Sequence, residues 1–230
     1  MMRQSINRKR IYFYLLIFLF ISTTFNYTSI SKLNDLSLIK EIDIRGLNDK
    51  EENNIRDKLK IFKNNNIFFI KKKEIENILS IFNFLDNIYI KKVLPSKLII
   101  LAKKTKFLGI AIIDGKKFYI GSNGKFTPIT QVTKEENLPI VFGKFPVDEF
   151  IKLQSILIKK EIKLKKIKKY FYHPSKRWDL EDYKGLVLML PYHNVENSLK
   201  TYKYLFDNTL ISSVKIVDLR IPGNVVLTHE

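Results

Sequence analysis

The sequence predicts an α+β protein with a single N-terminal transmembrane helix, a βααββ domain and then a mixed α/β domain whose sheet is mostly antiparallel. Three observations predict this fold. A long uncharged apolar run opens the chain, a strand-helix-helix-strand-strand pattern follows it, and the second half consists mainly of short β-prone stretches divided by glycine and asparagine.

The transmembrane helix is predicted over residues 11–30, which contain no charged side chain. About 20 apolar residues are the helical length that crosses a ~30 Å hydrocarbon core. Cations without acids in residues 1–10 predict that this tail stays in the cytoplasm. The alternatives are a cleaved signal peptide with its core at Ile11–Ile21 and a buried helix. No Ala-x-Ala cleavage pattern follows the run.

Composition limits the classes of function. The 230 residues carry a formal charge of +18, which would attract anionic lipids, acidic proteins or anionic polymers, and nucleic acid has to be considered. The lysines are scattered among isoleucine, asparagine and phenylalanine, a usage that an AT-rich genome produces by itself, so we predict no nucleic-acid partner. The chain has no cysteine, which excludes disulfides, a thiol nucleophile and a thiolate metal site.

The first domain is predicted over residues 37–106. Its opening strand stops at Gly46, and Asn48 and Glu51 then have the spacing of a capping box. The helix that follows carries apolar residues at i, i+4 and i+7. A tight apolar connector, Ile67–Ile70, leads to a second amphipathic helix, and two strands joined by a short turn complete the βααββ order.

The second domain is predicted over residues 107–230. Asp-Gly and Ser-Asn-Gly turns divide its first part into a meander of short strands. A helix is predicted over residues 148–166, with apolar side chains toward the core and lysines outward. A hairpin follows, then a helix capped by Asn194, and the stretch 214–227 closes the chain with strands.

The sequence predicts no enzyme, no cofactor and no metal site. Its histidines, His173, His193 and His229, are far apart and lack the i, i+4 spacing of ligands. Asp114 and Asp182 belong to turns and do not form an acid and base pair. No phosphate loop, nucleophile elbow or dinucleotide-binding glycine pattern occurs.

Five motifs follow one another along the chain: IKEIDIRG at Ile39–Gly46, VLPSKLII at Val93–Ile100, LPIVFG at Leu138–Gly143, RWDLEDYKGLVLMLP at Arg177–Pro191, and Asp-Leu-Arg at Asp218–Arg220. In this order they resemble the motifs of the FtsQ/DivIB family of bacterial division proteins. The resemblance covers the whole chain. One departure is the stretch 102–107, where the family carries a Glu-x-x-Pro-like segment, and any contact that needs an acid there is in doubt.

The resemblance implies that residues 37–106 are a POTRA domain and residues 107–230 an FtsQ-type β domain. It implies a non-catalytic scaffold of the divisome that links early septal-ring proteins to septal wall synthesis by recruiting the FtsB/FtsL pair. Other divisome membrane proteins would contact it. The expected location is the bacterial inner membrane at the septum, as a single-pass type II protein with periplasmic C-terminal domains.

The C-terminal strand is the candidate partner site. By sequence alone, Val225–Thr228 is a β-prone run with two alternatives: it simply finishes the fold, or it lies at a sheet edge and accepts a strand from another chain. Trp178 is expected in the core, with a partner anchor as the alternative. The partner-binding residues that the resemblance implies are Lys176, Arg177, Ile221, Gly223, Asn224, Val225, Val226, Leu227 and His229.

Two functions of other classes stay open. One is a POTRA-bearing component of outer-membrane assembly or secretion. The other is a membrane-anchored binder of an anionic polymer, which would require the lysines to gather on one face.

Overall fold

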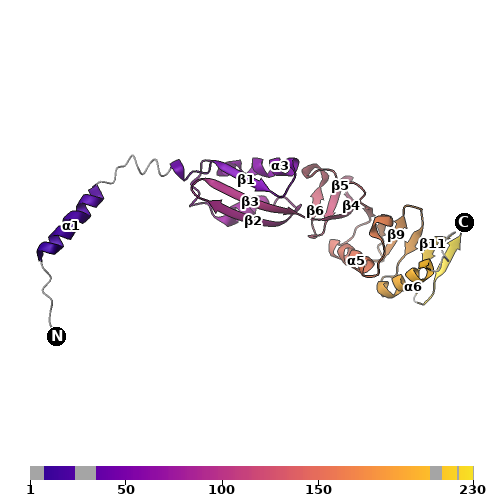
Figure 1. Cartoon of the computed structure of the whole chain (residues 1–230). Helices are drawn as coiled ribbons and strands as arrows, with labels where there is room; N and C mark the ends of the chain where they lie inside the picture. Colours follow the sequence, from indigo (N-terminus) through magenta and orange to yellow (C-terminus); the bar gives the residue numbers. More distant parts are fainter. Residues whose placement is uncertain (1–7, 24–34, 208–213, 222, 230) are drawn as a thin grey trace, which may run out of the picture.

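The computed structural model of the chain describes residues 8–23, 35–207, 214–221 and 223–229. Its strands form two sheets, one of three strands and one of nine. Figure 1 shows the two sheets following each other along an elongated body, with the smaller sheet nearer the N-terminal helix and the last strand at the far end.

The smaller sheet belongs to a βααββ unit, in which two helices and a short 3-10 turn lie between the first two strands. Strands β1 and β3 pair in parallel and β2 joins β3 antiparallel, so the order is β1-β3-β2. The elements are β1 Glu41–Arg45, α3 Asp49–Leu59, η1 Lys60–Phe62, α4 Lys72–Leu79, β2 Leu85–Val93 and β3 Lys97–Lys104.

Helix α3 begins at the capping box that the sequence predicts. The Asn48 side chain accepts a hydrogen bond from the Glu51 backbone N–H at 3.1 Å, and the Glu51 carboxylate accepts one from the Asn48 N–H at 3.4 Å. Two otherwise unpaired N–H groups at the helix start are thereby satisfied. The buried face of α3 carries Ile55 and Leu59, and that of α4 carries Ile75 and Leu79.

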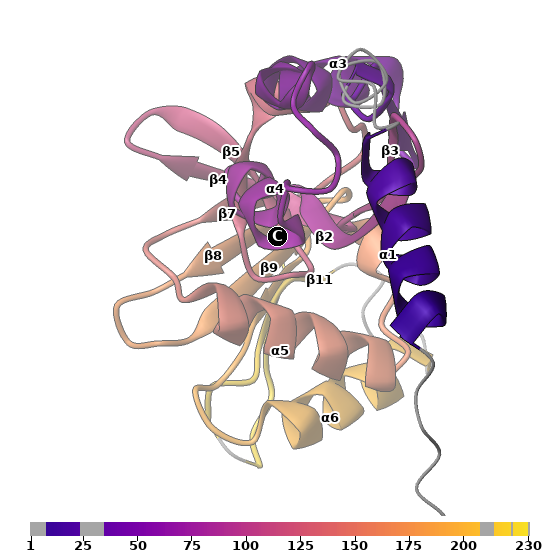
Figure 2. The same cartoon turned by 90° about the vertical axis from the view of Figure 1, so that its left-hand side faces the viewer.

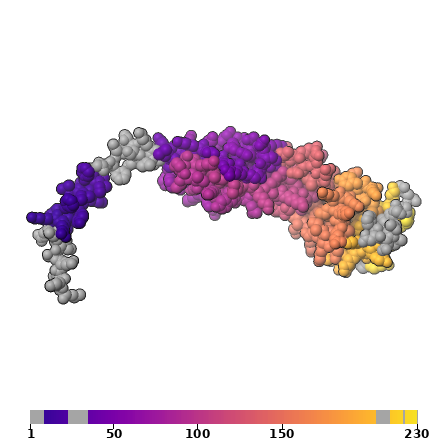
Figure 3. Space-filling view, viewed as in Figure 1, coloured from indigo at the N-terminus to yellow at the C-terminus, as the bar shows by residue number. Residues whose placement is uncertain are grey.

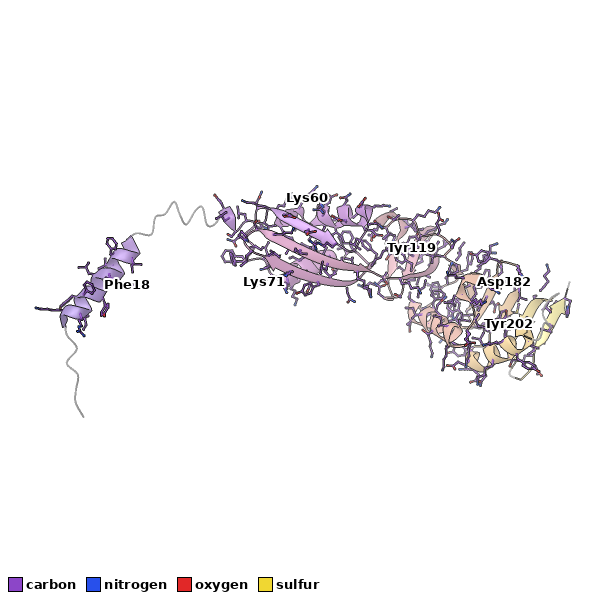
Figure 4. All side chains as sticks on the ribbon, in the orientation of Figure 1. Phe18, Lys60, Lys71, Tyr119, Asp182 and Tyr202 are labelled. Carbon is purple, nitrogen blue, oxygen red and sulfur yellow. The ribbon has the colours of Figure 1, made fainter. Side chains whose placement is uncertain are left out.

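The core of this unit continues into the next part of the chain. Phe107 and Tyr119 stack with their ring centroids 4.7 Å apart, and both rings are buried in the same cluster as the residues of α3 and α4. Figure 4 labels Tyr119 where the two sheets meet. The Asn123 side chain also donates to the Asn83 and Leu85 carbonyls at 3.0 and 3.2 Å. The hydrophobic core of the first unit therefore continues across the predicted domain boundary between residues 106 and 107.

The larger sheet has the order β12-β11-β10-β9-β8-β7-β4-β5-β6. Five of its neighbouring pairs are antiparallel and three are parallel. The strands are β4 Phe107–Ile113, β5 Lys116–Gly121, β6 Phe126–Pro128, β7 Ile140–Phe142, β8 Ile167–Tyr172, β9 Trp178–Asp182, β10 Val187–Met189, β11 Val214–Asp218 and β12 Val226–His229. The 3-10 turns η2 Ile129–Gln131 and η3 Leu164–Lys166 lie in its connections.

Helices α5 (Val147–Lys159) and α6 (Val195–Asp207) cover one face of this sheet, and Figure 2 shows them side by side. The parallel β10 and β11 are joined by the crossover that contains α6. Burial of apolar side chains from both helices and from alternate strand positions makes the second core. It includes Val141, Phe150, Leu153, Leu157, Tyr170, Leu180, Leu188, Leu199 and Val217.

The predicted transmembrane helix is wrong. Helix α1 covers Arg8–Thr23, which is 16 residues, and the part of the chain that the structure describes contains no helix of sufficient length and apolarity to span a bilayer. Sixteen helical residues rise only about 24 Å, less than a ~30 Å hydrocarbon core. The apolar run that motivated the prediction continues to residue 30, and residues 24–30 lie outside the described ones.

The predicted helix over residues 148–166 is also wrong at its C-terminal end. Helix α5 ends at Lys159, because Glu161 takes a left-handed conformation with φ of 58°. The lysine-rich segment beyond it forms η3 and then enters β8, a strand that the sequence pattern did not predict. Alternation of lysine with apolar residues in KIKKYFY is ambiguous between a helix end and a strand.

Replacing Gly46 with alanine is expected to lower the free energy of unfolding by about 2 kcal/mol or more. Gly46 has φ of +93°, and an added Cβ would collide with the carbonyl oxygen of Ala102, a backbone atom of the central strand β3. Gly185→Ala is the matched control, since Gly185 has φ of +87° but open space around the Cβ position. It should cost only about 1 kcal/mol. Equal costs in urea titrations would contradict the backbone collision at Gly46.

Candidate partner-binding edge

Strand β12 lies at an edge of the larger sheet. It pairs antiparallel with β11, with Val217 opposite Leu227 and Asp218 opposite Val226. Its other side pairs with no strand among the described residues. Figures 1 and 3 show this C-terminal end of the chain, in yellow, at the opposite end of the folded body from the smaller sheet. An edge of this kind leaves backbone N–H and C=O groups available to another strand.

Side chains of β12 alternate between the two faces of the sheet. Leu227 is half-buried and packs on the second core, as does Val225 just before the strand. Val226 is 51% exposed, and Thr228 and His229 are exposed as well. The strand is thus held by Val225 and Leu227, while Val226 contributes little to the core and is presented to solvent.

The approach to β12 is fixed by Asp218 and Arg220. The Arg220 guanidinium donates to both Asp218 carboxylate oxygens at 2.6 to 2.9 Å, and the Arg220 backbone N–H donates to the same carboxylate at 2.9 Å. Gly223 then turns the chain with φ of +78°, and the Asn224 N–H donates to the Ile221 carbonyl at 3.1 Å. Local hydrogen bonds of Asp218 and Arg220 therefore hold the segment that leads into the turn before β12.

The Asp218→Asn variant is expected to flatten the acid side of the stability curve. Hydrogen bonding and charge attraction from Arg220 hold the pKa of Asp218 below its usual range. A carboxylate with a lowered folded-state pKa stabilises the fold fully above its unfolded value near 4. That contribution is lost as pH falls through the lower folded-state pKa. Urea titrations from pH 2 to pH 7 should show a smaller loss of stability in the variant, and equal slopes would contradict this.

Lys176 and Arg177 lie in the turn between β8 and β9, and the structure separates their environments. Lys176 is exposed, with φ of 58°, and lines a cavity of about 500 Å³ beside the start of α6. Arg177 is half-buried, and its Nε lies 3.7 Å from the Asp179 carboxylate. Arg177 therefore faces a carboxylate of its own domain, whereas Lys176 faces open space.

A second cavity of about 270 Å³ connects the turn before β12 with the same part of α6. Ile221, Gly223, Asn224 and Val225 line it. Both cavities share Pro191, His193, Asn194 and Asn197. The structure thus brings Lys176 and four residues of the C-terminal turn to two neighbouring hollows, while Val226, Leu227 and His229 lie along the strand itself.

Sequence reasoning missed a polar cluster behind this region. His173 Nε2 lies 2.6 Å from the Asp179 carboxylate, and Asp179 is almost fully buried. Asp179 Oδ1 and Arg177 Nε are both buried with no hydrogen-bond partner among the described residues. Asp179 pairs across the sheet with Met189, which pairs with Asp218, so the two carboxylates share one face. The histidine and aspartate are six residues apart across a turn, and no spacing rule would have joined them.

Comparison with known proteins gives one family. The family model described as "Cell division protein FtsQ/DivIB, C-terminal" matches residues 111–220. Among solved structures, the chain is similar to the major extracytoplasmic domain of the trans isomer of the bacterial cell division protein DivIB from Geobacillus stearothermophilus. That match has 14% identity and a TM-score of 0.34, and it covers 45% of this chain and 92% of the other. No curated protein matches the chain.

Proposed function

Because the chain belongs to the FtsQ/DivIB family of cell division proteins through its residues 111–220, we propose that it is a non-catalytic scaffold of the divisome. In this proposal, β12 recruits the FtsB/FtsL pair by accepting a strand from the partner. The scaffold thereby links early septal-ring proteins to the synthesis of septal wall. The two folded domains act on the outer side of the cytoplasmic membrane at the septum.

The observation that carries the proposal is the place of β12 at the end of the strand order. Strand addition uses main-chain hydrogen bonds for affinity and side-chain pockets for specificity. The edge of β12 can supply the hydrogen bonds, and the cavities beside the start of α6 offer pockets. An aliphatic side chain at Val226 gives the added strand an apolar neighbour.

The proposed partner-binding residues keep distinct roles. Leu227, Val226 and His229 belong to the strand that is extended, while Lys176 can meet an acidic side chain of the partner beside the first cavity. Arg177 is expected to position Lys176 and the β8–β9 turn and not to contact the partner itself, since its guanidinium faces the Asp179 carboxylate. The full proposed set is Lys176, Arg177, Ile221, Gly223, Asn224, Val225, Val226, Leu227 and His229.

Two measurements test the proposal at its two levels. The immobilised full-length chain should capture the FtsB/FtsL pair of the source bacterium from detergent solution, and depletion of the chain should give cells that elongate without septa. Normal septation after depletion would refute the division role. Failed septation without capture of the pair would keep the division role and refute the partner.

A further inference from the structure

A cluster of exposed apolar side chains lies at one end of the smaller domain. It consists of Ile61, Phe68, Phe69 and Leu94, called here the loop patch, whose exposed fractions are 63%, 60%, 81% and 59%. Single exposed apolar residues are ordinary on protein surfaces. Several aliphatic and aromatic residues gathered on neighbouring loops mark an interaction surface.

Hydrogen bonds place these loops together. The Lys92 ammonium group, two residues before Leu94, donates to the Phe68 carbonyl at 3.4 Å, and the Asn65 side chain donates to the Ile61 carbonyl at 3.2 Å. The Ile67 N–H donates to the Ser37 carbonyl at 2.9 Å, next to the point where the chain enters the domain. The loop patch is therefore one surface formed by the 61–69 segment and the β2–β3 hairpin.

The hydrophobic core does not use these side chains. In the same segment Phe62, Ile67 and Ile70 are buried, whereas Phe68 and Phe69 between them point to solvent. The connector that the sequence predicts as simply apolar is thus divided into two buried isoleucines and two exposed phenylalanines. Packing of the domain gives no reason for two phenylalanines at these positions.

The sequence stretch that forms most of the loop patch is strongly basic. Residues 58–73 contain six lysines and no acidic residue. Two acids that flank this stretch are already engaged, since Asp57 pairs with Lys60 at 2.7 Å and Glu74 caps the start of α4 at the Lys71 N–H. Figure 4 labels Lys60 and Lys71 on this domain. Lys71, Lys72 and Lys73 are all exposed.

We propose that the loop patch is a lipid-contact surface, which inserts its aromatic and aliphatic side chains among the headgroups of an anionic bilayer. Phenylalanine and leucine favour the boundary between headgroups and acyl chains, and lysines around them are attracted to the negative surface of the leaflet. Long lysine stems can also cover apolar surface while their charges stay in water. A protein partner with acidic side chains is the competing occupant, and it would leave a reporter in the patch unquenched by vesicles.

This inference is separate from the proposed recruitment of partners. Strand β12 belongs to the larger sheet, whereas the loop patch belongs to the domain of the smaller sheet, and the two sheets follow each other along the body (Figure 1). A negative result for lipid contact would leave strand addition untouched, and the reverse holds as well.

Depth-dependent fluorescence quenching in the full-length chain tests the proposal. Helix α1 has many exposed apolar side chains, so vesicle binding by the whole chain would not report on the loop patch. The Phe69→Trp variant places a reporter in the patch, and its signal is the difference from the parent chain, whose single tryptophan, Trp178, is buried. With phosphatidylcholine and phosphatidylglycerol vesicles that carry brominated acyl chains, the added tryptophan should shift to shorter wavelength and be quenched.

A matched control comes from the other domain. Ile158 on α5 is 60% exposed and is followed by two lysines, so Ile158→Trp offers a solvent-exposed reporter beside lysines. We expect no quenching at position 158. An unquenched reporter at position 69 would overturn the proposal, and so would equal quenching at both positions.

The role of charge is tested by removing lysines from the patch. Each lysine near an anionic surface contributes about fivefold to binding. In the Phe69→Trp background, Lys71→Gln with Lys73→Gln should therefore raise the concentration of phosphatidylglycerol-containing vesicles needed for half-maximal quenching by roughly 25-fold. Lys116→Gln with Lys117→Gln removes the same charge from the exposed β4–β5 hairpin and should change nothing. Equal effects of the two pairs would show attraction by net charge alone and would overturn the assignment to the patch.

Discussion

Under the proposed recruitment, replacing Val226 with glutamate is expected to weaken capture of the FtsB/FtsL pair by about 30-fold or more, which corresponds to about 2 kcal/mol. Val226 lies on the edge strand and is 51% exposed, so the free chain can keep a carboxylate there in water. A strand added to β12 would cover that charge and leave it without a partner, which is costly. Titration of the immobilised chain with the pair measures the change.

The Val226→Glu variant is informative because it leaves the core contacts of β12 in place, and the new carboxylate, which lies opposite Asp218, should cost no more than about 1 kcal/mol of the free energy of unfolding. Leu227 and Val225 pack on the core, and substitutions there would mix loss of binding with loss of stability. Ile158→Glu, at an exposed position on α5, is the control for added charge in the same domain and should bind normally. Unchanged affinity of the folded Val226→Glu variant would exclude strand addition at this edge.

Truncating Trp178 to alanine is expected to cost about 3–5 kcal/mol of the free energy of unfolding. Its ring is buried, with centroids 4.8 Å from Tyr172, 5.6 Å from Phe145 and 5.7 Å from Phe150. Loss of the indole would leave a cavity between β9 and α5 that these rings cannot fill without moving. Circular dichroism in urea should follow the change, since the variant has no tryptophan.

A partner anchor at Trp178 would behave differently. Trp178→Phe keeps most of the aromatic packing and should retain most of the stability that alanine loses. If Trp178→Ala kept its unfolding midpoint while losing the FtsB/FtsL pair, the residue would be an interface anchor. The buried ring position favours the core, which is the first of the two readings that the sequence left open.

Local chemistry made the smaller domain predictable. Asn48 and Glu51 predict the start of α3, because a capping box needs only two suitable residues three positions apart. Gly46 likewise predicts a turn, because its backbone conformation is one that residues with a Cβ disfavour. The same reasoning did not predict that Phe68 and Phe69 are exposed. A four-residue apolar run carries no period from which buried and exposed positions can be told apart.

Long-range arrangement in the larger domain was beyond the sequence. The His173 and Asp179 contact and the two cavities beside α6 depend on which strands become neighbours, and that order is set by crossovers such as the one between β10 and β11. The resemblance to a family supplied the terminal strand as a site, but only the strand order shows that β12 lies at an edge. For helix α1 the sequence predicted too much. Hydropathy shows that residues 11–30 are apolar, but it does not determine where a helix in them ends, and α1 ends at Thr23.

The stacked pair Phe107 and Tyr119 has a mechanical consequence. Together with the bonds from Asn123 to the Asn83 and Leu85 carbonyls, it couples the two sheets across their joint. A coupled joint resists bending, so we expect the folded body to behave as one stiff unit and not as two domains that reorient independently. If the loop patch rests on a bilayer, the stiff body sets the distance and the angle between the bilayer surface and β12. A partner strand that cannot extend to that distance from the membrane could not pair with β12.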